Sequence, residues 1–411
     1  MTEVYTLAAL WLGLALLATL LSIWLRVATA MSEIVVGTVA QLIIGAVFGA
    51  AALGVDQGWI KFLSAVGAVL LTFLAGVELD PDALRKNGKE AFGLGLVGFI
   101  APFLGCAAVA HWVLGWGTAA SWLTGIALST TSVAVVYAVM LELGLNRTSY
   151  GKGLLAACFV NDLATVLALG LMFAPFTMKT VIFAGVSVVA FVVLPWLTPR
   201  FFRRFGGRPS ELETKYLLLI LFALGALATW AGSEAVLPAY IVGMILAKTV
   251  GKDHALVRRL RTLTLGFLTP FYFIRAGSYV SIPALVSGFG AFLILLAAKM
   301  ATKILAVYPT TQVFRKPKRE GVYTTLMMST GLTFGSISAL YGLTHGIVTN
   351  AQYSYIIAAV IGSAVVPTLI ANAFFLPHHL LPKDPLPSAT ETADTPAIVV
   401  ATSATQAQEE I

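Results

Sequence analysis

The chain has 411 residues, of which 58% are hydrophobic and only 11% are charged, and its mean hydropathy is +0.90. A soluble protein of this length needs a far more charged surface, so the composition excludes a soluble domain and indicates a polytopic membrane protein. The formal charge of +7 does not require a nucleic-acid partner, because the distribution of the basic residues along the chain accounts for it. Both cysteines lie inside hydrophobic runs, which excludes a disulfide scaffold and gives no metal-ligand spacing.

Hydrophobic runs of about one bilayer's length follow one another along the chain, since ~20 helical residues cross the hydrocarbon core. They end before the segment 383–411, which is rich in Ala, Thr, Pro and Glu without periodicity and is typical of a disordered tail. We therefore predict one transmembrane domain, 1–382, and a cytoplasmic tail, 383–411. The thirteen predicted spans are 4–27, 34–55, 59–79, 90–113, 118–141, 152–173, 178–198, 213–232, 235–250, 257–281, 284–308, 320–343 and 351–376.

The basic residues divide unequally between the two sides of the predicted spans. Of the 26 Lys and Arg residues, 22 follow odd-numbered spans, Lys303 being counted among them. Lys61 and Lys179 follow even-numbered spans, and Arg275 and Lys299 lie inside spans. Because cytoplasmic loops carry the excess of Lys and Arg, we expect the N-terminus outside the cell membrane and the C-terminus in the cytoplasm.

Short matches recur at an offset of about 200 residues. Leu74-Ala75-Gly76 corresponds to Arg275-Ala276-Gly277, Ser129-Thr130 to Ser329-Thr330, and Ala156-Ala157 to Ala358-Ala359. Seven spans separate the copies, and because seven is odd, the two copies enter the membrane from opposite sides. This predicts an inverted-topology repeat, the architecture of many secondary transporters, with a binding site at mid-depth.

Asp162 lies near the centre of the sixth span, directly after Asn161. A carboxylate at that depth costs about 2.5–3.5 kcal/mol or more, so a chain that keeps one usually provides a partner, a proton or an ion. Lys299 lies close to the centre of the eleventh span. A static buried pair of Asp162 and Lys299 is the simplest structural alternative.

Two further spans carry polar runs at mid-depth, Ser129–Ser132 in the fifth span and Ser329–Ser336 in the twelfth. Runs of Ser, Thr and Gly weaken a helix and let it unwind. Unwound backbone at this depth is tolerated only inside protein or beside a cavity. We therefore predict two broken helices that cross near Asp162, where Asp162 and Lys299 neutralise the half-helix ends; the alternative is that the hydroxyls only pack helices together.

The chemistry of a carboxylate suits exchange. Its oxygens are hard ligands for Na⁺ or K⁺, it also accepts a proton, and desolvation makes protonation competitive with cation binding. A single group that holds either a cation or a proton, but never both, couples their movements in opposite directions. Asp162 is therefore our candidate site for a monovalent cation and for the proton.

Three further residues are candidate accessory residues. Glu78 ends the third span and either lines an entrance funnel or is a solvated helix end. Cys158 lies one turn before Asp162 and either lines the same face or is a small buried hydrophobic residue. Arg275 lies in the outer half of its span, where we expect structural hydrogen bonds to carbonyl groups rather than contact with a substrate.

Taken together, the motifs resemble those of monovalent cation:proton antiporters, the bacterial Na⁺/H⁺ or K⁺/H⁺ exchangers. The resemblance covers about residues 5–380 and depends on Phe73–Leu79, Thr130–Val135, Asn161-Asp162 and Lys299. It implies an all-α fold with crossing broken helices, a dimerisation part, and a core part that moves as an elevator in a homodimer. We assign spans 3–6 and 10–13 to the core part and spans 1–2 and 7–9 to the dimerisation and linker part.

The resemblance also implies roles for individual residues. Asp162 carries the cation and the proton, Thr130, Thr131 and Ser132 supply oxygen ligands beside Asn161, and Lys299 compensates charge. Members that exchange unequal charge carry two adjacent aspartates, whereas this chain has Asn161 first. One carboxylate favours electroneutral 1:1 exchange, unless Lys299 also carries a proton.

We therefore expect a secondary antiporter of Na⁺, K⁺ or Li⁺ against H⁺, without enzymatic activity or a cofactor. Its partners are the cation, the proton and the lipid bilayer.

Two alternatives use the same site. A sodium-coupled symporter for an organic anion shares inverted repeats and broken helices but needs additional polar residues to hold a carboxylate. An ion channel or ion-responsive receptor uses the site for gating, and conductance far above carrier rates or binding without exchange distinguishes it.

Overall fold

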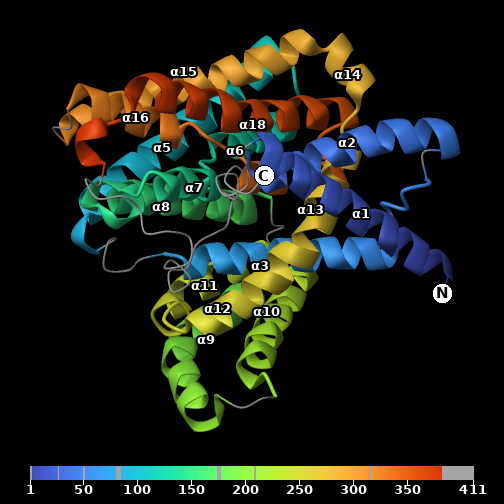
Figure 1. Cartoon of the computed structure of the whole chain (residues 1–411), viewed down its shortest axis with the longest axis vertical. Helices are drawn as coiled ribbons and strands as arrows, with labels where there is room; N and C mark the ends of the chain where they lie inside the picture. Colours follow the sequence, from blue (N-terminus) through green and yellow to red (C-terminus); the bar gives the residue numbers. More distant parts are fainter. Residues whose placement is uncertain are drawn as a thin grey trace, which may run out of the picture.

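Helices account for the regular structure in the computed structural model, which describes residues 2–25, 27–49, 51–79, 85–173, 177–207, 210–314 and 317–381 (Figure 1). The predicted tail, 383–411, lies outside these residues. The α-helices are α1 (Thr2–Leu25), α2 (Thr29–Phe48), α3 (Gly58–Val77), α5 (Gly88–Ala108), α6 (Thr118–Ser129), α7 (Val133–Glu142), α8 (Ser149–Met172), α9 (Met178–Phe205), α10 (Leu212–Trp230), α11 (Val236–Val250), α12 (His254–Leu263), α13 (Thr269–Ser278), α14 (Ile282–Ser287), α15 (Phe289–Val313), α16 (Lys318–Met328), α17 (Thr333–Thr344) and α18 (Asn350–Ile370). Short helical turns are η1 (Val109–Val113), η2 (Leu145–Arg147), η3 (Thr264–Leu268), η4 (Ala371–Phe375) and η5 (His378–Leu380).

Eleven helical segments of the described residues are long and hydrophobic enough to cross a membrane. They correspond to eleven of the predicted spans. The predicted span 235–250 is the short helix α11. The predicted span 257–281 is divided among α12, the π-helical turn η3 and α13, and Pro270 lies in the first turn of α13. The count of thirteen therefore stays a prediction for these two spans.

The helices pack in two groups. In the first group, α5 contacts α6, α8 and α15, and α18 contacts α15 and α17. In the second, α3 packs on α11, and α13 packs on α2. Figure 1 shows the first group above, around α15 and α18, and α3, α9, α10, α11 and α12 of the second group below. The helices α3 and α13, which belong to the predicted spans 3 and 10, pack with the second group. These two spans are predicted from the sequence to lie in the core part.

Corresponding elements recur with the predicted offset. The helices α5, α6–α7 and α8 are followed about 200 residues later by α15, α16–α17 and α18 in the same order. The second group repeats as well: Gly76 of α3 lies against the Tyr240 carbonyl of α11, and Gly277 of α13 lies against the Ile34 carbonyl of α2. Each glycine lets two backbones approach where a Cβ atom would collide. The two helix pairs, α3 with α11 and α13 with α2, are thus equivalent copies.

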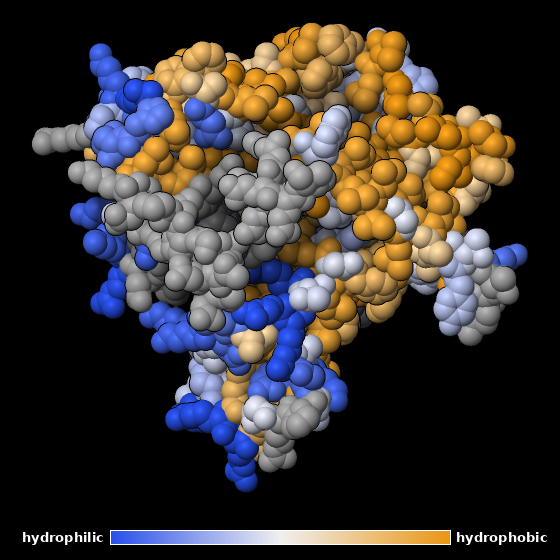
Figure 2. All heavy atoms as spheres, in the orientation of Figure 1, coloured by the Kyte–Doolittle hydropathy of each residue, from blue (hydrophilic) through white to orange (hydrophobic). Residues whose placement is uncertain are grey.

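Hydrophobic side chains cover a large part of the molecular surface. Figure 2 shows them along the top and right of the view, over α15 and the N-terminal helices, and hydrophilic residues along the left and bottom. Such a surface fits a lipid environment, since it is too hydrophobic for water.

One basic residue lies in a different place from the one predicted. Lys303, counted with the loop after the eleventh span, lies well inside α15 and is fully buried. The prediction is wrong because α15 continues to Val313, so that Lys303 is far from the end of the helix. A lysine within a span faces the protein interior, since lipid does not solvate its charge.

Candidate functional site

Both predicted helix breaks are present. The fifth span is interrupted at Thr130–Ser132, between α6 and α7, and the twelfth at Ser329–Leu332, between α16 and α17. These two spans are also the most enclosed of the candidate spans, with 83% and 89% of an 18-residue hydrophobic stretch of each buried. This placement satisfies the requirement that irregular backbone at membrane depth be enclosed by protein.

The two breaks contact each other directly. The Ser132 N–H donates to the Thr330 carbonyl at 3.1 Å. The Thr131 hydroxyl donates to the Met328 carbonyl, the last residue of α16, at 2.8 Å. Carbonyl groups that the broken helix leaves without an intrahelical partner are thus satisfied across the crossing.

The other two hydroxyls of the first break stay within their own half-helices. Thr130 Oγ1 donates to the Ala127 carbonyl at 3.1 Å, and Ser132 Oγ accepts from the Val135 N–H at 3.3 Å. A hydroxyl oxygen has two lone pairs, so these bonds leave acceptor capacity on both oxygens. Both residues are buried.

Asn161 positions the first break. Its Oδ1 accepts from the Thr131 N–H at 2.9 Å, and its Nδ2 donates to the Gly95 carbonyl of α5 at 3.3 Å. The amide therefore joins α8 to both α5 and the break. A Cβ atom on Gly95 would meet the Val160 side chain and the Ala157 carbonyl, so this close approach of α5 to α8 depends on glycine.

Asp162 follows Asn161 in α8 and is only 2% exposed. Its Oδ1 is buried and has no hydrogen-bond partner in the described residues. A buried carboxylate oxygen without a donor is costly, so it indicates a bound proton, water or ion. Asp162 thus faces the protein interior, as a carrier site requires.

Two lysines of α15 approach the breaks. Lys303 Nζ donates to Thr131 Oγ1 at 3.0 Å, and its positive charge interacts with the Asp162 carboxylate. Lys299 Nζ lies against Gly331 of the second break, where a Cβ atom would overlap it, and has no hydrogen-bond partner in the described residues. The static pair of Asp162 with Lys299 is therefore not formed among the described residues, and Lys303 is the lysine whose charge reaches Asp162.

Sequence reasoning missed Lys303, although a signal was available. Lys299 and Lys303 are four residues apart, so they lie on the same face of α15.

Sequence reasoning also missed Tyr240 of α11, which is fully buried beside Asp162. The Tyr240 hydroxyl donates to the Phe159 carbonyl of α8 at 3.1 Å, and its ring packs against Phe334 of α17. Tyr240 is thus a contact between the two groups of helices at the depth of the site.

The accessory candidates have separate partners. Cys158 is buried with its Sγ 3.6 Å from Met328 Sδ, so it lies near the crossing. Glu78 pairs with Arg261 of α12 at 2.7 Å, and both side chains are 14% exposed.

Arg275 is buried and donates from Nε to the Val55 carbonyl at 3.0 Å and from Nη2 to the Tyr279 hydroxyl at 2.9 Å. This is the expected hydrogen bonding to a carbonyl group. The structure therefore brings Cys158 to the crossing but gives Glu78 and Arg275 partners of their own.

Comparison with known families agrees with this geometry. The family model described as sodium/hydrogen exchanger, transmembrane, matches residues 12–376. The chain belongs to the sodium/hydrogen exchanger family. It is therefore a member of the monovalent cation:proton antiporter superfamily, which confirms the resemblance seen in the sequence.

Individual relatives of this exchanger come from several kingdoms. Probable Na(+)/H(+) antiporter 3 of Methanocaldococcus jannaschii is 26% identical over 351 residues, 82% of this chain and 89% of the relative. Na(+)/H(+)-K(+) antiporter GerN of Bacillus cereus is 25% identical over 357 residues, 81% of this chain and 89% of the relative. Cation/H(+) antiporter 18 of Arabidopsis thaliana is 25% identical over 377 residues, but those residues cover 84% of this chain and only 46% of the relative.

A solved structure shows the same fold. The sodium proton antiporter MjNhaP1 from Methanocaldococcus jannaschii at pH 8 superposes with a TM-score of 0.67 at 15% identity, covering 90% of this chain and 96% of that one. The exchanger thus has the predicted antiporter-like fold with inverted repeats and two crossing broken helices.

Proposed function

We propose that the chain exchanges a monovalent cation, Na⁺ or also K⁺ or Li⁺, for H⁺ across a cell membrane with 1:1 stoichiometry. Membership of the sodium/hydrogen exchanger family supports the reaction class. The observation that carries the site assignment is the buried Asp162 oxygen, which has no donor among the described residues and lies near two crossing helix breaks.

Asp162 is the shared carrier in this proposal, and the residues around it have distinct roles. Thr131 Oγ1 accepts from Lys303 and donates to Met328, so one lone pair remains for a cation. Thr130 and Ser132 supply further oxygens. Asn161 holds the break in place, because both ends of its amide are already engaged. Lys303, rather than Lys299, compensates the charge of the carboxylate.

In this proposal, alternating access uses a movement between the two groups of helices. The cation site belongs to the group that contains α8, α15 and the breaks, whereas α3 and α11 belong to the other group. Tyr240 of α11 contacts both α8 and α17, so a sliding movement between the groups breaks these contacts and changes the surroundings of Asp162. The chain works in this way as a homodimer with its C-terminus in the cytoplasm.

The test uses purified protein in liposomes with an imposed pH gradient and a pH-sensitive dye inside. Adding Na⁺, K⁺ or Li⁺ in turn should move protons with the wild type, and the order of the responses gives the cation preference. Asp162→Asn should abolish the response. The matched control is Asp56→Asn, which removes a carboxylate from the exposed loop between α2 and α3 and should leave exchange intact.

If Asp162→Asn exchanges cations for protons as fast as the wild type, the site assignment is wrong. If the wild type moves no protons with any of the three cations, the proposed reaction itself is wrong. Equal reconstitution of the variants, measured by protein recovery in the liposomes, is required for either comparison.

A further inference from the structure

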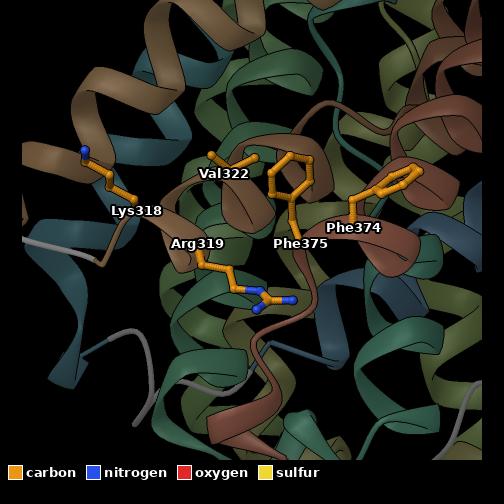
Figure 3. Close-up of a pocket in the computed structure, with 5 residues that line it drawn as sticks. All are labelled: Lys318, Arg319, Val322, Phe374 and Phe375. Atoms are coloured by element: carbon orange, nitrogen blue, oxygen red, sulfur yellow. The ribbon is translucent and has the colours of Figure 1, made fainter.

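A cavity of about 360 Å³ that is wide open to the surface lies outside the candidate cation site, where the start of α16 meets the end of the last span (Figure 3). Its lining residues are Lys318, Arg319 and Val322 of α16 and Phe374 and Phe375 of η4. Figure 3 shows the Arg319 side chain extending from α16 below the Phe375 ring. The cavity therefore combines basic groups on one side with aromatic rings on the other.

The position of the cavity along the membrane helices fixes its depth. Lys318 is the first residue of one candidate span, Lys318–Thr344, and Phe375 is the last residue of another, Asn350–Phe375. The ends of membrane helices lie at the level of the lipid headgroups, where aromatic and basic side chains gather. Phe374 is 70% exposed, so its ring is available to lipid chains.

Among the residues that the structure describes, none compensates the charges of Lys318 and Arg319. Lys318 and Arg319 are exposed and form no ion pair or hydrogen bond with any other described residue. Glu320, the next residue of the same turn, does not line the cavity and pairs with His379 Nε2 at 2.7 Å. Two positive charges thus lie at the headgroup level without a described acidic residue beside them in the lining.

We propose that this cavity binds one anionic phospholipid. The phosphate contacts the Arg319 guanidinium, Lys318 adds positive charge although its amine points away from the rings in Figure 3, and an acyl chain runs along Val322, Phe374 and Phe375. Charge complementarity selects an anionic headgroup over a zwitterionic one, and the aromatic wall selects a lipid over a free phosphate ion. The site differs from the cation site in position, in ligand class and in residues.

Binding is measured by native mass spectrometry of the purified full-length protein in micelles doped with phosphatidylglycerol or phosphatidylcholine of the same acyl composition. Each basic residue near an anionic lipid surface contributes about fivefold to binding. The double variant Lys318→Gln/Arg319→Gln should therefore bind phosphatidylglycerol about 25-fold more weakly than the wild type. Phosphatidylcholine should bind weakly to both proteins.

The matched control is Lys248→Gln/Lys252→Gln, which removes the same charge from exposed positions at the end of α11, away from the cavity lining. It should keep the wild-type affinity for phosphatidylglycerol. An equal loss in both double variants would show that the attraction is diffuse and that the cavity binds no particular lipid. Equal binding of the two lipids to the wild type would overturn the proposal as well.

A second variant separates a lipid from a free anion. Phe374→Ala keeps both basic residues and should weaken phosphatidylglycerol binding several-fold, while inorganic phosphate, tested in the same micelles, should bind poorly to wild type and variant alike. If inorganic phosphate displaces the lipid at low millimolar concentration and Phe374→Ala changes nothing, the cavity is a phosphate site and the lipid assignment is refuted. Gel filtration and circular dichroism confirm that all variants stay folded.

Discussion

The contact of Lys303 with Thr131 gives the sharpest quantitative test of the site. Thr131→Val keeps the shape of the side chain but removes the hydroxyl that donates to the Met328 carbonyl and accepts from Lys303. Loss of the first hydrogen bond costs about 1 kcal/mol. Loss of the acceptor for Lys303 Nζ, which is fully buried, costs about 1 kcal/mol for a neutral amine and about 1.5–3 kcal/mol for an ammonium.

We therefore expect Thr131→Val to lower the free energy of unfolding by about 2–4 kcal/mol. The control is Thr325→Val, a substitution at an equally buried threonine whose hydroxyl donates to the Gly321 carbonyl of its own helix at 2.8 Å. This control loses one local hydrogen bond and leaves no buried amine without an acceptor. Its cost should be about 1 kcal/mol.

A double-mutant cycle isolates the interaction itself. The free energy of unfolding is measured in mixed micelles, by titration with a denaturing detergent, for wild type, Thr131→Val, Lys303→Met and the double variant. The two substitutions should be less than additive by about 1–3 kcal/mol, and the size indicates whether Lys303 is an amine or an ammonium. Additivity within about 0.5 kcal/mol would refute the inference that Lys303 holds the break through Thr131.

Three further outcomes follow from individual contacts. Gly95→Ala should destabilise the protein by about 1–3 kcal/mol and slow exchange, because the added Cβ atom pushes α5 away from α8. The control Gly13→Ala, at a position with open space around it, should change neither stability nor exchange in the same unfolding and liposome assays. Glu78→Gln breaks an ion pair that is only 14% exposed and should cost about 1–3 kcal/mol, with little dependence on salt. The control Glu211→Gln breaks the Arg259–Glu211 ion pair, which has the same 2.7 Å length but side chains that are about half exposed. It should lower the free energy of unfolding by about 0.2–1 kcal/mol, and by less at high salt. Equal costs of the two substitutions would contradict the argument from burial. Burial raises the pKa of Glu234, in the loop before α11, so the folded protein loses stability as the pH rises above the pKa of this carboxyl in the unfolded chain, near 4.5. Compared with the wild type, Glu234→Gln should therefore have a higher melting temperature at pH 7 and the same melting temperature at pH 4.

The helix breaks were predictable from the sequence because they depend on local composition. Serine, threonine and glycine at the centre of a hydrophobic span compete with the helical hydrogen bonds, and two such runs occur at one offset, Ser129–Ser132 and Ser329–Ser336. The burial of Asp162 was predictable as well, since a charge near the centre of the bilayer is costly and therefore faces the protein interior. These features need no knowledge of how the helices pack.

The features that were missed depend on packing. The sequence places Lys299 and Lys303 on one face, but only the position of α15 beside the breaks decides which of the two reaches Thr131. Likewise, α3 and α13 join the second group because Gly76 and Gly277 let α11 and α2 approach closely. Glycines at matching places of a repeat were visible in the sequence, but the helix that each one contacts was not.

The proposed 1:1 stoichiometry depends on the titratable groups around Asp162. A carboxylate that carries one cation and a carboxylate that carries one proton have the same net charge, so exchange at Asp162 alone moves no charge across the membrane. Asn161 adds no titratable group, and only Lys299 or Lys303 is able to change this result, by releasing a proton when the cation binds. We propose that both lysines keep their protons through the cycle, so that Asp162 alone sets the stoichiometry. With a potential-sensitive dye in the liposomes, cation/proton exchange by the wild type should then generate no membrane potential, whereas a potential that disappears in Lys303→Met would show that Lys303 takes part in proton transport.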